Sequence, residues 1–257
     1  IVGMGAQRWL DLGYFQVQPS EIVKMTLVLA LARYFHGANL EDVSRPAFLM
    51  APFLMLVVPA LLVLRQPDLG TALMLIIGGL SIFFLAGVRI WKFALLIGGT
   101  LATMPFLWMG LHGYQKQRIL VFLDPGSDPL GAGYHILQSQ IALGSGGLWG
   151  KGFLQGTQAH LNFLPEKQTD FIFTMLAEEF GIAGGLLLLG LYLLLVFCGF
   201  MISLRSRNQF GRLLGMGLTV TFALYFFVNI AMVTGLIPVV GVPLPLISYG
   251  GTALLML

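Results

Sequence analysis

Asp170 stands where a long polar loop meets an apolar segment, in the stretch Asn162-Phe-Leu-Pro-Glu-Lys-Gln-Thr-Asp-Phe-Ile-Phe173. Thr169 is expected to be the N-cap of a helix, which places Asp170 in the first helical turn. The helix dipole and the unpaired N–H groups of that turn favour a carboxylate there. Such a carboxylate at a water–lipid boundary could act on a polar substrate. The alternative is that Asp170 only starts a helix.

Glu21 and Lys24 are the second candidate group. They are three residues apart, so they share a helix face and can pair. An ion pair just inside the membrane interface is costly unless it is satisfied or used, so it is either an ordinary structural pair or part of a site. Asp68 follows Pro67 at a helix start, where capping and substrate binding are equal alternatives.

The remaining polar candidates also have two interpretations. Lys116 and Arg118 begin an amphipathic stretch that could face lipid phosphates or grip a pyrophosphate. Tyr249 precedes two glycines that permit close approach of a ligand or of another helix. The full set of candidate substrate-binding residues is Arg8, Trp9, Glu21, Lys24, Asp68, Lys116, Arg118, Glu166, Ser248 and Tyr249.

The composition predicts an all-α polytopic integral membrane protein. The chain is 57% hydrophobic and 10% charged, whereas soluble domains have about 25% charged residues. Several apolar runs reach the roughly 20 residues that span a bilayer as a helix. The single Cys198 excludes an internal disulfide and implies no metal site. The net charge of +3, without a basic cluster, does not indicate nucleic-acid binding.

About seven spans are expected in one transmembrane domain over residues 1–257. They cover residues 22–35, 48–64, 69–86, 93–111, 170–202, 213–236 and a last one from 248. Residues 112–169 form a long extramembrane loop, with short helical pieces expected at 117–123 and 134–143. A connection of this length is usually functional or disordered, and its apolar content argues for structure. The ends of the chain are typical of a fragment.

The distribution of cations predicts the orientation. Arg33 and the connections 36–47, 87–92 and 203–212 carry seven Lys and Arg residues, against three (Arg8, Lys24 and Arg65) in the short connections opposite. The positive-inside rule makes the first side cytoplasmic. The long loop, Asp170, Asp68 and residues 248–251 are therefore expected on the outside.

Six motifs together resemble the SEDS (shape, elongation, division and sporulation) family of bacterial proteins. In chain order they are residues 5–13 (GAQRWLDLG), 18–24 (QPSEIVK), 66–71 (QPDLGT), 117–125 (QRILVFLDP), 163–173 (FLPEKQTDFIF) and 247–251 (ISYGG). Members of this family form helical bundles of about ten spans. One departure is Gln168, where a histidine commonly precedes Thr-Asp.

The resemblance implies a peptidoglycan glycosyltransferase of the bacterial cytoplasmic membrane that polymerises lipid II and works with a class B penicillin-binding protein. The family's essential acidic residue would be Asp170, with further functional positions at Trp9, Glu21, Lys24 and Asp68.

The expected reaction is an inverting transfer. A lipid-linked glycan is the donor, undecaprenyl pyrophosphate leaves, and the 4-hydroxyl of lipid II is the acceptor. Asp170 would accept or orient the hydroxyl proton, and Lys24, aided by Arg8, Lys116 or Arg118, would stabilise the pyrophosphate. A divalent cation (Mg²⁺ or Mn²⁺) could share that charge. A helix N-terminus makes a carboxylate a weaker base, whereas desolvation has the opposite effect, so Asp170 is open as base or as ligand.

Two alternatives remain. A lipid II flippase is favoured by the Pro-broken segment before Ser248 and by Glu178 and Glu179, because intramembrane carboxylates are typical of ion-coupled transporters. The concentration of polar groups on one face argues against it. A scaffold that only activates its penicillin-binding partner is the third interpretation.

Overall fold

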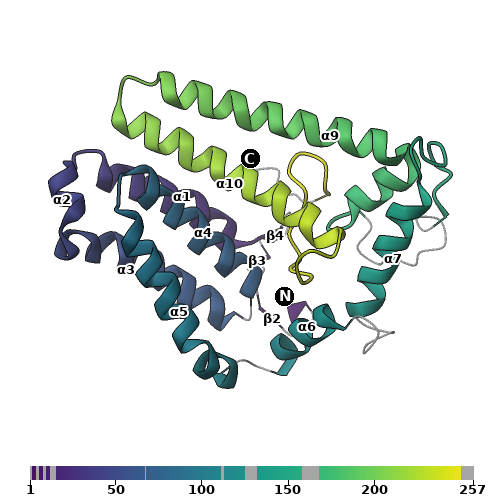
Figure 1. The fold of residues 1–257 in the computed structure, drawn as a ribbon, viewed down its shortest axis with the longest axis horizontal. Coiled ribbons are helices and arrows are strands. Elements are labelled where there is room, and N and C mark those ends of the chain that lie inside the picture. Colours follow the sequence, from purple (N-terminus) through teal and green to yellow (C-terminus); the bar gives the residue numbers. More distant parts are fainter. Residues whose placement is uncertain are drawn as a thin grey trace. The chain divides into compact units, whose positions relative to one another are not determined.

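A computed structural model of the chain describes residues 2–3, 6–7, 10–11, 16–66, 68–110, 113–124, 132–157 and 168–249. Helices make up most of this part, which confirms the predicted all-helical membrane class (Figure 1). Within the described residues, three helices are long and apolar enough to cross a membrane: α3 (Pro46–Arg65), α9 (Ile172–Arg205) and α10 (Gln209–Val233). The apolar helices α4 (Leu69–Leu85) and α5 (Ile90–Gly110) are also present.

The described chain forms two compact units. Of the described residues, those within 2–92 and 193–225 form the first unit, and those within 93–192 and 226–249 form the second. The helices α9 and α10 contribute residues to both. No observation tests the single-domain prediction, which stays a prediction.

The first unit is built on α1 (Pro19–Phe35), α3 and α4, with the short α2 (Leu40–Ser44) between α1 and α3. These helices pack through large apolar side chains that are fully buried, including Leu31, Phe35, Leu56 and Ile82. Near the N-terminus two pairs of two-residue strands are antiparallel: β1 (Val2–Gly3) with β2 (Ala6–Gln7), and β3 (Leu10–Asp11) with β4 (Gln16–Val17).

The second unit contains α6 (Gly113–Leu123) and α7 (Ala132–Ser145), which confirms the two helical pieces predicted inside the long loop. The buried hydroxyl of Ser139 joins three helices. It lies 2.8 Å from the Thr174 hydroxyl on α9 and donates to the Val233 carbonyl on α10, also at 2.8 Å. The loop residues therefore fold as part of a packed unit.

Helix α9 is broken at Gly181, which has φ 68° and ψ −168°. The loop that follows α7 satisfies both helix ends at the break. The N–H groups of Lys151 and Gly152 donate to the carbonyls of Glu178 and Glu179, each at 3.0 Å. In return, Ile182 donates to Gly147 and Ala183 to Leu148. The prediction of one continuous helix over 170–202 was wrong here, because these backbone groups pair with the loop instead of along the helix.

Gly181 cannot be replaced without loss, for two reasons. Its dihedral angles lie in a region that is essentially restricted to glycine. A Cβ atom would also overlap the backbone of Leu148 and Gly150 in the loop. Gly181→Ala is therefore expected to destabilise the protein by at least about 1–3 kcal/mol, measured as a lower thermal midpoint in detergent.

Gly190→Ala is the matched control, because Gly190 lies in regular helix and a Cβ atom added to it would meet nothing within 4 Å. Alanine there is expected to be neutral or stabilising by about 0.5–1 kcal/mol. Equal effects of the two substitutions would contradict the role assigned to the break.

Candidate functional site

Asp170 precedes helix α9, which begins at Ile172. The carbonyl of Phe171 accepts the first helical hydrogen bonds, from the N–H groups of Thr174 at 3.0 Å and Met175 at 3.3 Å. The prediction that Thr169 caps the helix and that Asp170 lies in its first turn was therefore wrong by about two residues. Asp170 belongs to the turn that leads into the helix.

The backbone of this turn is held by one donor from helix α10 and two from the end of the described chain. Three consecutive carbonyls each accept a hydrogen bond: Gln168 from the Tyr249 N–H at 2.9 Å, Thr169 from the Ser248 hydroxyl at 2.5 Å, and Asp170 from the Asn229 amide at 2.9 Å. We refer to these three donors, on Asn229, Ser248 and Tyr249, as the carbonyl clamp. Because the clamp engages these carbonyls, the chain is kept out of helical geometry until Phe171.

The clamp also orders the segment that faces Asp170. Asn229 is fully buried, and its amide donates a second bond to the Val242 carbonyl at 2.6 Å. The neighbouring Gly241 has φ 77°, and a Cβ atom on it would lie 3.3 Å from Oδ2 of Asp170. The Asp170 carboxylate is therefore packed against a glycine backbone, with both backbone segments fixed by the same side chain.

Sequence reasoning missed Asn229. The available signal was a single amide side chain within the apolar run of α10, where an intramembrane polar group needs partners. Ser248, a predicted substrate-binding residue, is buried, and its hydroxyl also accepts from the Leu244 N–H at 2.7 Å. The Tyr249 side chain is exposed. Direct substrate binding by Ser248 or Tyr249 stays a prediction.

Asn229→Ala is expected to destabilise the protein by about 1–3 kcal/mol, because it leaves the Asp170 and Val242 carbonyls without their amide donor. Thermal unfolding in detergent measures this. Gln140→Ala is the control, since it removes an exposed amide that donates to the Thr234 carbonyl at 3.4 Å. If Gln140→Ala lowers the stability as much as Asn229→Ala does, the Asn229 hydrogen bonds contribute no more to stability than an exposed one.

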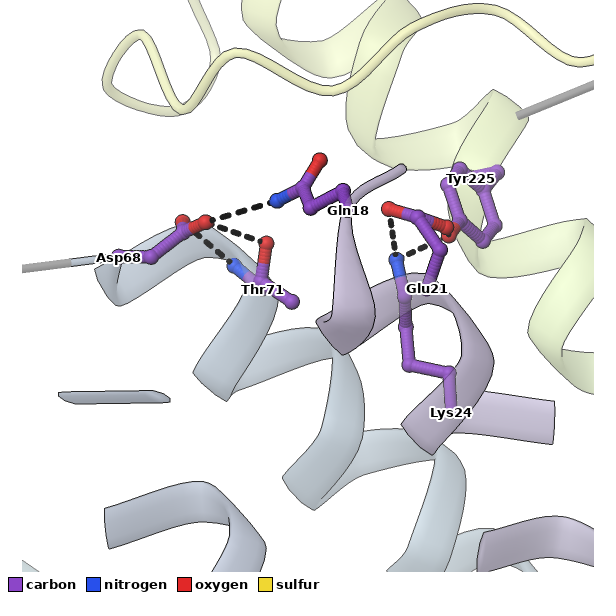
Figure 2. A network of polar contacts seen from close by, with 6 residues as sticks. All are labelled: Gln18, Glu21, Lys24, Asp68, Thr71 and Tyr225. Atoms are coloured by element: carbon purple, nitrogen blue, oxygen red, sulfur yellow. Dashed lines mark hydrogen bonds and ion pairs between the residues drawn. The ribbon is translucent and has the colours of Figure 1, made fainter. Parts of the chain in front are cut away.

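A second polar cluster lies in the first unit (Figure 2). Lys24 Nζ lies 2.7 Å from Glu21 Oε1, and it also donates to the hydroxyl of Tyr225, which in turn donates to Glu21. Glu21 is 7% exposed and Lys24 is 4% exposed. This confirms the predicted Glu21–Lys24 pair and adds Tyr225, whose ring lies 4.3 Å from the ammonium.

Asp68 is the other carboxylate of this cluster (Figure 2). It caps α4, accepting from the Thr71 N–H at 3.2 Å and from the Thr71 hydroxyl at 2.9 Å. Gln18 Nε2 donates to the same carboxylate at 3.3 Å, which ties the start of α1 to the start of α4. The capping role predicted for Asp68 is confirmed, and a role in substrate binding stays a prediction.

The structure describes only some of the remaining predicted residues. Arg8, Trp9 and Glu166 lie outside the described residues. Lys116 is half-buried on α6; Arg118 belongs to the same helix, but its side chain lies outside the described part. Within the described residues, no three His, Cys, Asp or Glu side chains gather in a group that could hold a metal ion.

Glu178 is paired inside the second unit. Its side chain is 0% exposed and accepts from Lys151 Nζ at 2.7 Å and from the Thr157 hydroxyl at 3.0 Å. Lys151 also donates to Thr157 at 2.8 Å. In the sequence, Glu178 favoured the transporter alternative. In the structure, its carboxylate is paired with the same loop that supplies hydrogen-bond partners at the break in α9.

Comparisons with known proteins agree with the family resemblance of the six sequence motifs. The sequence profile of the FtsW/RodA/SpoVE family, described as "Cell cycle protein", matches residues 1–257. The peptidoglycan glycosyltransferase MrdB of Escherichia coli K12 is 51% identical over 263 residues, which cover 100% of this chain and 69% of MrdB.

Two solved structures are similar as well. A chain from a peptidoglycan synthase complex, studied for the coordination of polymerization and crosslinking, superimposes with a TM-score of 0.79 at 34% identity. The match covers 98% of this chain and 70% of the other. The rod shape determining protein RodA of Thermus thermophilus gives 0.65 at 30% identity, over 99% of this chain and 66% of RodA.

Proposed function

The chain belongs to the FtsW/RodA/SpoVE family of cell cycle proteins, and on that basis we propose that it is a peptidoglycan glycosyltransferase that polymerises lipid II during cell-wall elongation. This membership confirms the SEDS resemblance in the motifs. The observation within the chain that supports the proposal most is the fixed position of Asp170, whose backbone the carbonyl clamp holds outside helix α9. A clamped turn suits a residue that must meet a reacting group in one geometry.

The chain is a membrane protein, and the proposed site lies on the external face of the bacterial cytoplasmic membrane. The excess of Lys and Arg on the opposite connections supports this orientation. Lipid II would then approach Asp170 from the outer leaflet.

In the proposed reaction the 4-hydroxyl oxygen of lipid II bonds to the anomeric carbon of the lipid-linked glycan, with inversion. The bond from that carbon to undecaprenyl pyrophosphate breaks, and the pyrophosphate leaves with the electron pair. Asp170 accepts or orients the hydroxyl proton. Lys24 has three N–H donors; it uses them toward Glu21 and Tyr225 in this structure, and would stabilise the pyrophosphate in the reaction.

The proposed partner is a class B penicillin-binding protein, which would cross-link the strands that this chain makes. The similarity to a chain of a peptidoglycan synthase complex supports this assignment.

A role for Mg²⁺ or Mn²⁺ stays a proposal, and the described residues offer no three-ligand group for it. A cation of this kind is commonly held by one or two carboxylates and by substrate phosphates, so Asp170 with a pyrophosphate would be the ligand set. Chelation with EDTA tests this: polymerisation that survives chelation would exclude the cation.

The flippase alternative is less well supported. At the break in α9 the carbonyls of Glu178 and Glu179 accept hydrogen bonds from the loop, and Glu178 is paired with Lys151. In ion-coupled transporters the unwound backbone of such a break coordinates the ion. Here those groups are engaged internally.

The deciding experiment uses the full-length protein, purified with its penicillin-binding partner and supplied with lipid II in detergent. Glycan strands resolved on a gel are the expected product. Absence of strands from an intact complex, together with lipid II translocation in liposomes, would establish the flippase instead. Strands made by the complex but unaffected by substitution at Asp170 would favour the scaffold.

A further inference from the structure

The loop between α7 and the stretch before α9 carries large apolar side chains that point away from the protein. Trp149 is 84% exposed, and Leu148, Phe153 and Leu154 are also mostly exposed. Exposed apolar patches of this kind mark contact sites for a membrane or for another protein. We call residues 146–154 the apolar loop.

The apolar loop is held rigidly, so its exposed side chains are displayed by the fold. Four backbone hydrogen bonds join it to both sides of the Gly181 break, between residues 147–152 and residues 178–183. The Phe153 ring lies 6.1 Å from the Phe180 ring. Leu154 has φ 59°, a conformation that persists in a leucine only where the surroundings determine it.

The length of α9 places this break relative to the membrane. The 24 residues from Ile182 to Arg205 form about 36 Å of helix, which by itself spans a hydrocarbon core of about 30 Å. Exposed leucines such as Leu186, Leu187 and Leu194 line that span. The break at Gly181 therefore lies at the membrane boundary opposite Arg205.

We propose that the apolar loop inserts into the interfacial region of the lipid bilayer and anchors the helical segment 172–180 at the membrane surface. The exposed surface of the loop continues the apolar surface of the span, since Ile182 and Ala183 bond directly to loop carbonyls. Trp149 is the type of residue enriched at the headgroup level. The ammonium of the partly exposed Lys151 is directed to Glu178, so the one cation of the loop is paired with a carboxylate of the protein.

The anchor has a consequence for Asp170, because the segment 172–180 begins two residues after it. A loop seated in the interface sets the depth of that segment through the carbonyls of Glu178 and Glu179. The proposal requires only that the chain spans a membrane, so it stands or falls separately from the glycosyltransferase assignment.

The test is a depth measurement by spin labelling of the full-length protein in lipid nanodiscs. The chain has one cysteine, Cys198, so a Cys198→Ala background allows single labels at Trp149→Cys and Phe153→Cys. Leu187→Cys provides the reference inside the span, and Arg207→Cys provides the reference in water. Collision rates with oxygen, which concentrates in lipid, and with a water-soluble nickel chelate are measured at each site.

The expected result is a shift at positions 149 and 153 from the water reference toward the span reference, with high oxygen and low nickel accessibility. Nickel accessibility equal to that at Arg207→Cys would overturn the proposal, because the loop would then face water. Low accessibility to both reagents would overturn it too, since protein would cover the loop.

Discussion

Asp170→Asn is expected to lower the rate of lipid II polymerisation by at least about 100-fold, which is the lower end of the contribution of a positioned proton acceptor. Asparagine has nearly the same shape as aspartate but cannot accept the proton. The main-chain bonds of Gln168, Thr169 and Asp170 with the clamp do not involve the Asp170 carboxylate, so the substitution should leave the turn in place. Glycan strands from the variant and the wild type, each with its partner, are compared on a gel.

Two controls make this result interpretable. Glu41→Gln is the same carboxylate-to-amide change at an exposed residue of α2 that belongs to none of the six motifs, and it should leave the rate unchanged. A thermal midpoint of Asp170→Asn close to that of the wild type shows that the turn is intact. Normal polymerisation by a folded Asp170→Asn variant would exclude Asp170 as the proton acceptor.

The sequence predicted the parts of the site that follow local rules. Glu21 and Lys24 pair because a spacing of three residues brings side chains together on any helix. Asp68 caps α4 because a short acidic side chain before a helix can reach the next N–H groups. Helix existence and approximate position also follow from composition, which is why α6 and α7 could be predicted inside the long loop.

The features that the sequence did not predict depend on contacts between distant segments. Tyr225 joins Glu21 across 204 residues, and Asn229 reaches Asp170 across 59. An aromatic or an amide in an apolar run does not indicate which distant group it will meet. The start of α9 was misplaced for the same reason, because carbonyls held from residues 229–249 decide where the helix begins.

The break in α9 is the clearest feature that depends on a distant segment and could not be predicted from the local sequence. Gly181 is one of several glycines in an apolar run, and nothing local distinguishes it from Gly184, Gly185 or Gly190. Only the loop from residue 146 to 152, which supplies partners for both helix ends, makes this position the break. A span that looked continuous is therefore a short helical segment followed by the helix that crosses the membrane.

Lys24→Met is expected to destabilise the protein by about 3–5 kcal/mol, because it leaves the buried Glu21 carboxylate without its cation. The hydroxyl of Tyr225 would still donate to that carboxylate, but it carries no charge to compensate it. The thermal midpoint in detergent measures the loss. Polymerisation should fall as well, and that decrease alone does not separate a structural role from a role in stabilising the pyrophosphate.

The double variant Glu21→Gln with Lys24→Met separates the two roles. It removes both charges together, so most of the lost stability should return, since a buried pair replaced as a unit costs far less than a broken one. If the charged pair takes part in the reaction, through the Lys24 ammonium on the leaving pyrophosphate or through the Glu21 carboxylate, the double variant stays inactive although it is folded. If the Glu21–Lys24 pair only joins α1 to Tyr225 of α10, activity returns with stability, and the part assigned to Lys24 in the reaction is wrong.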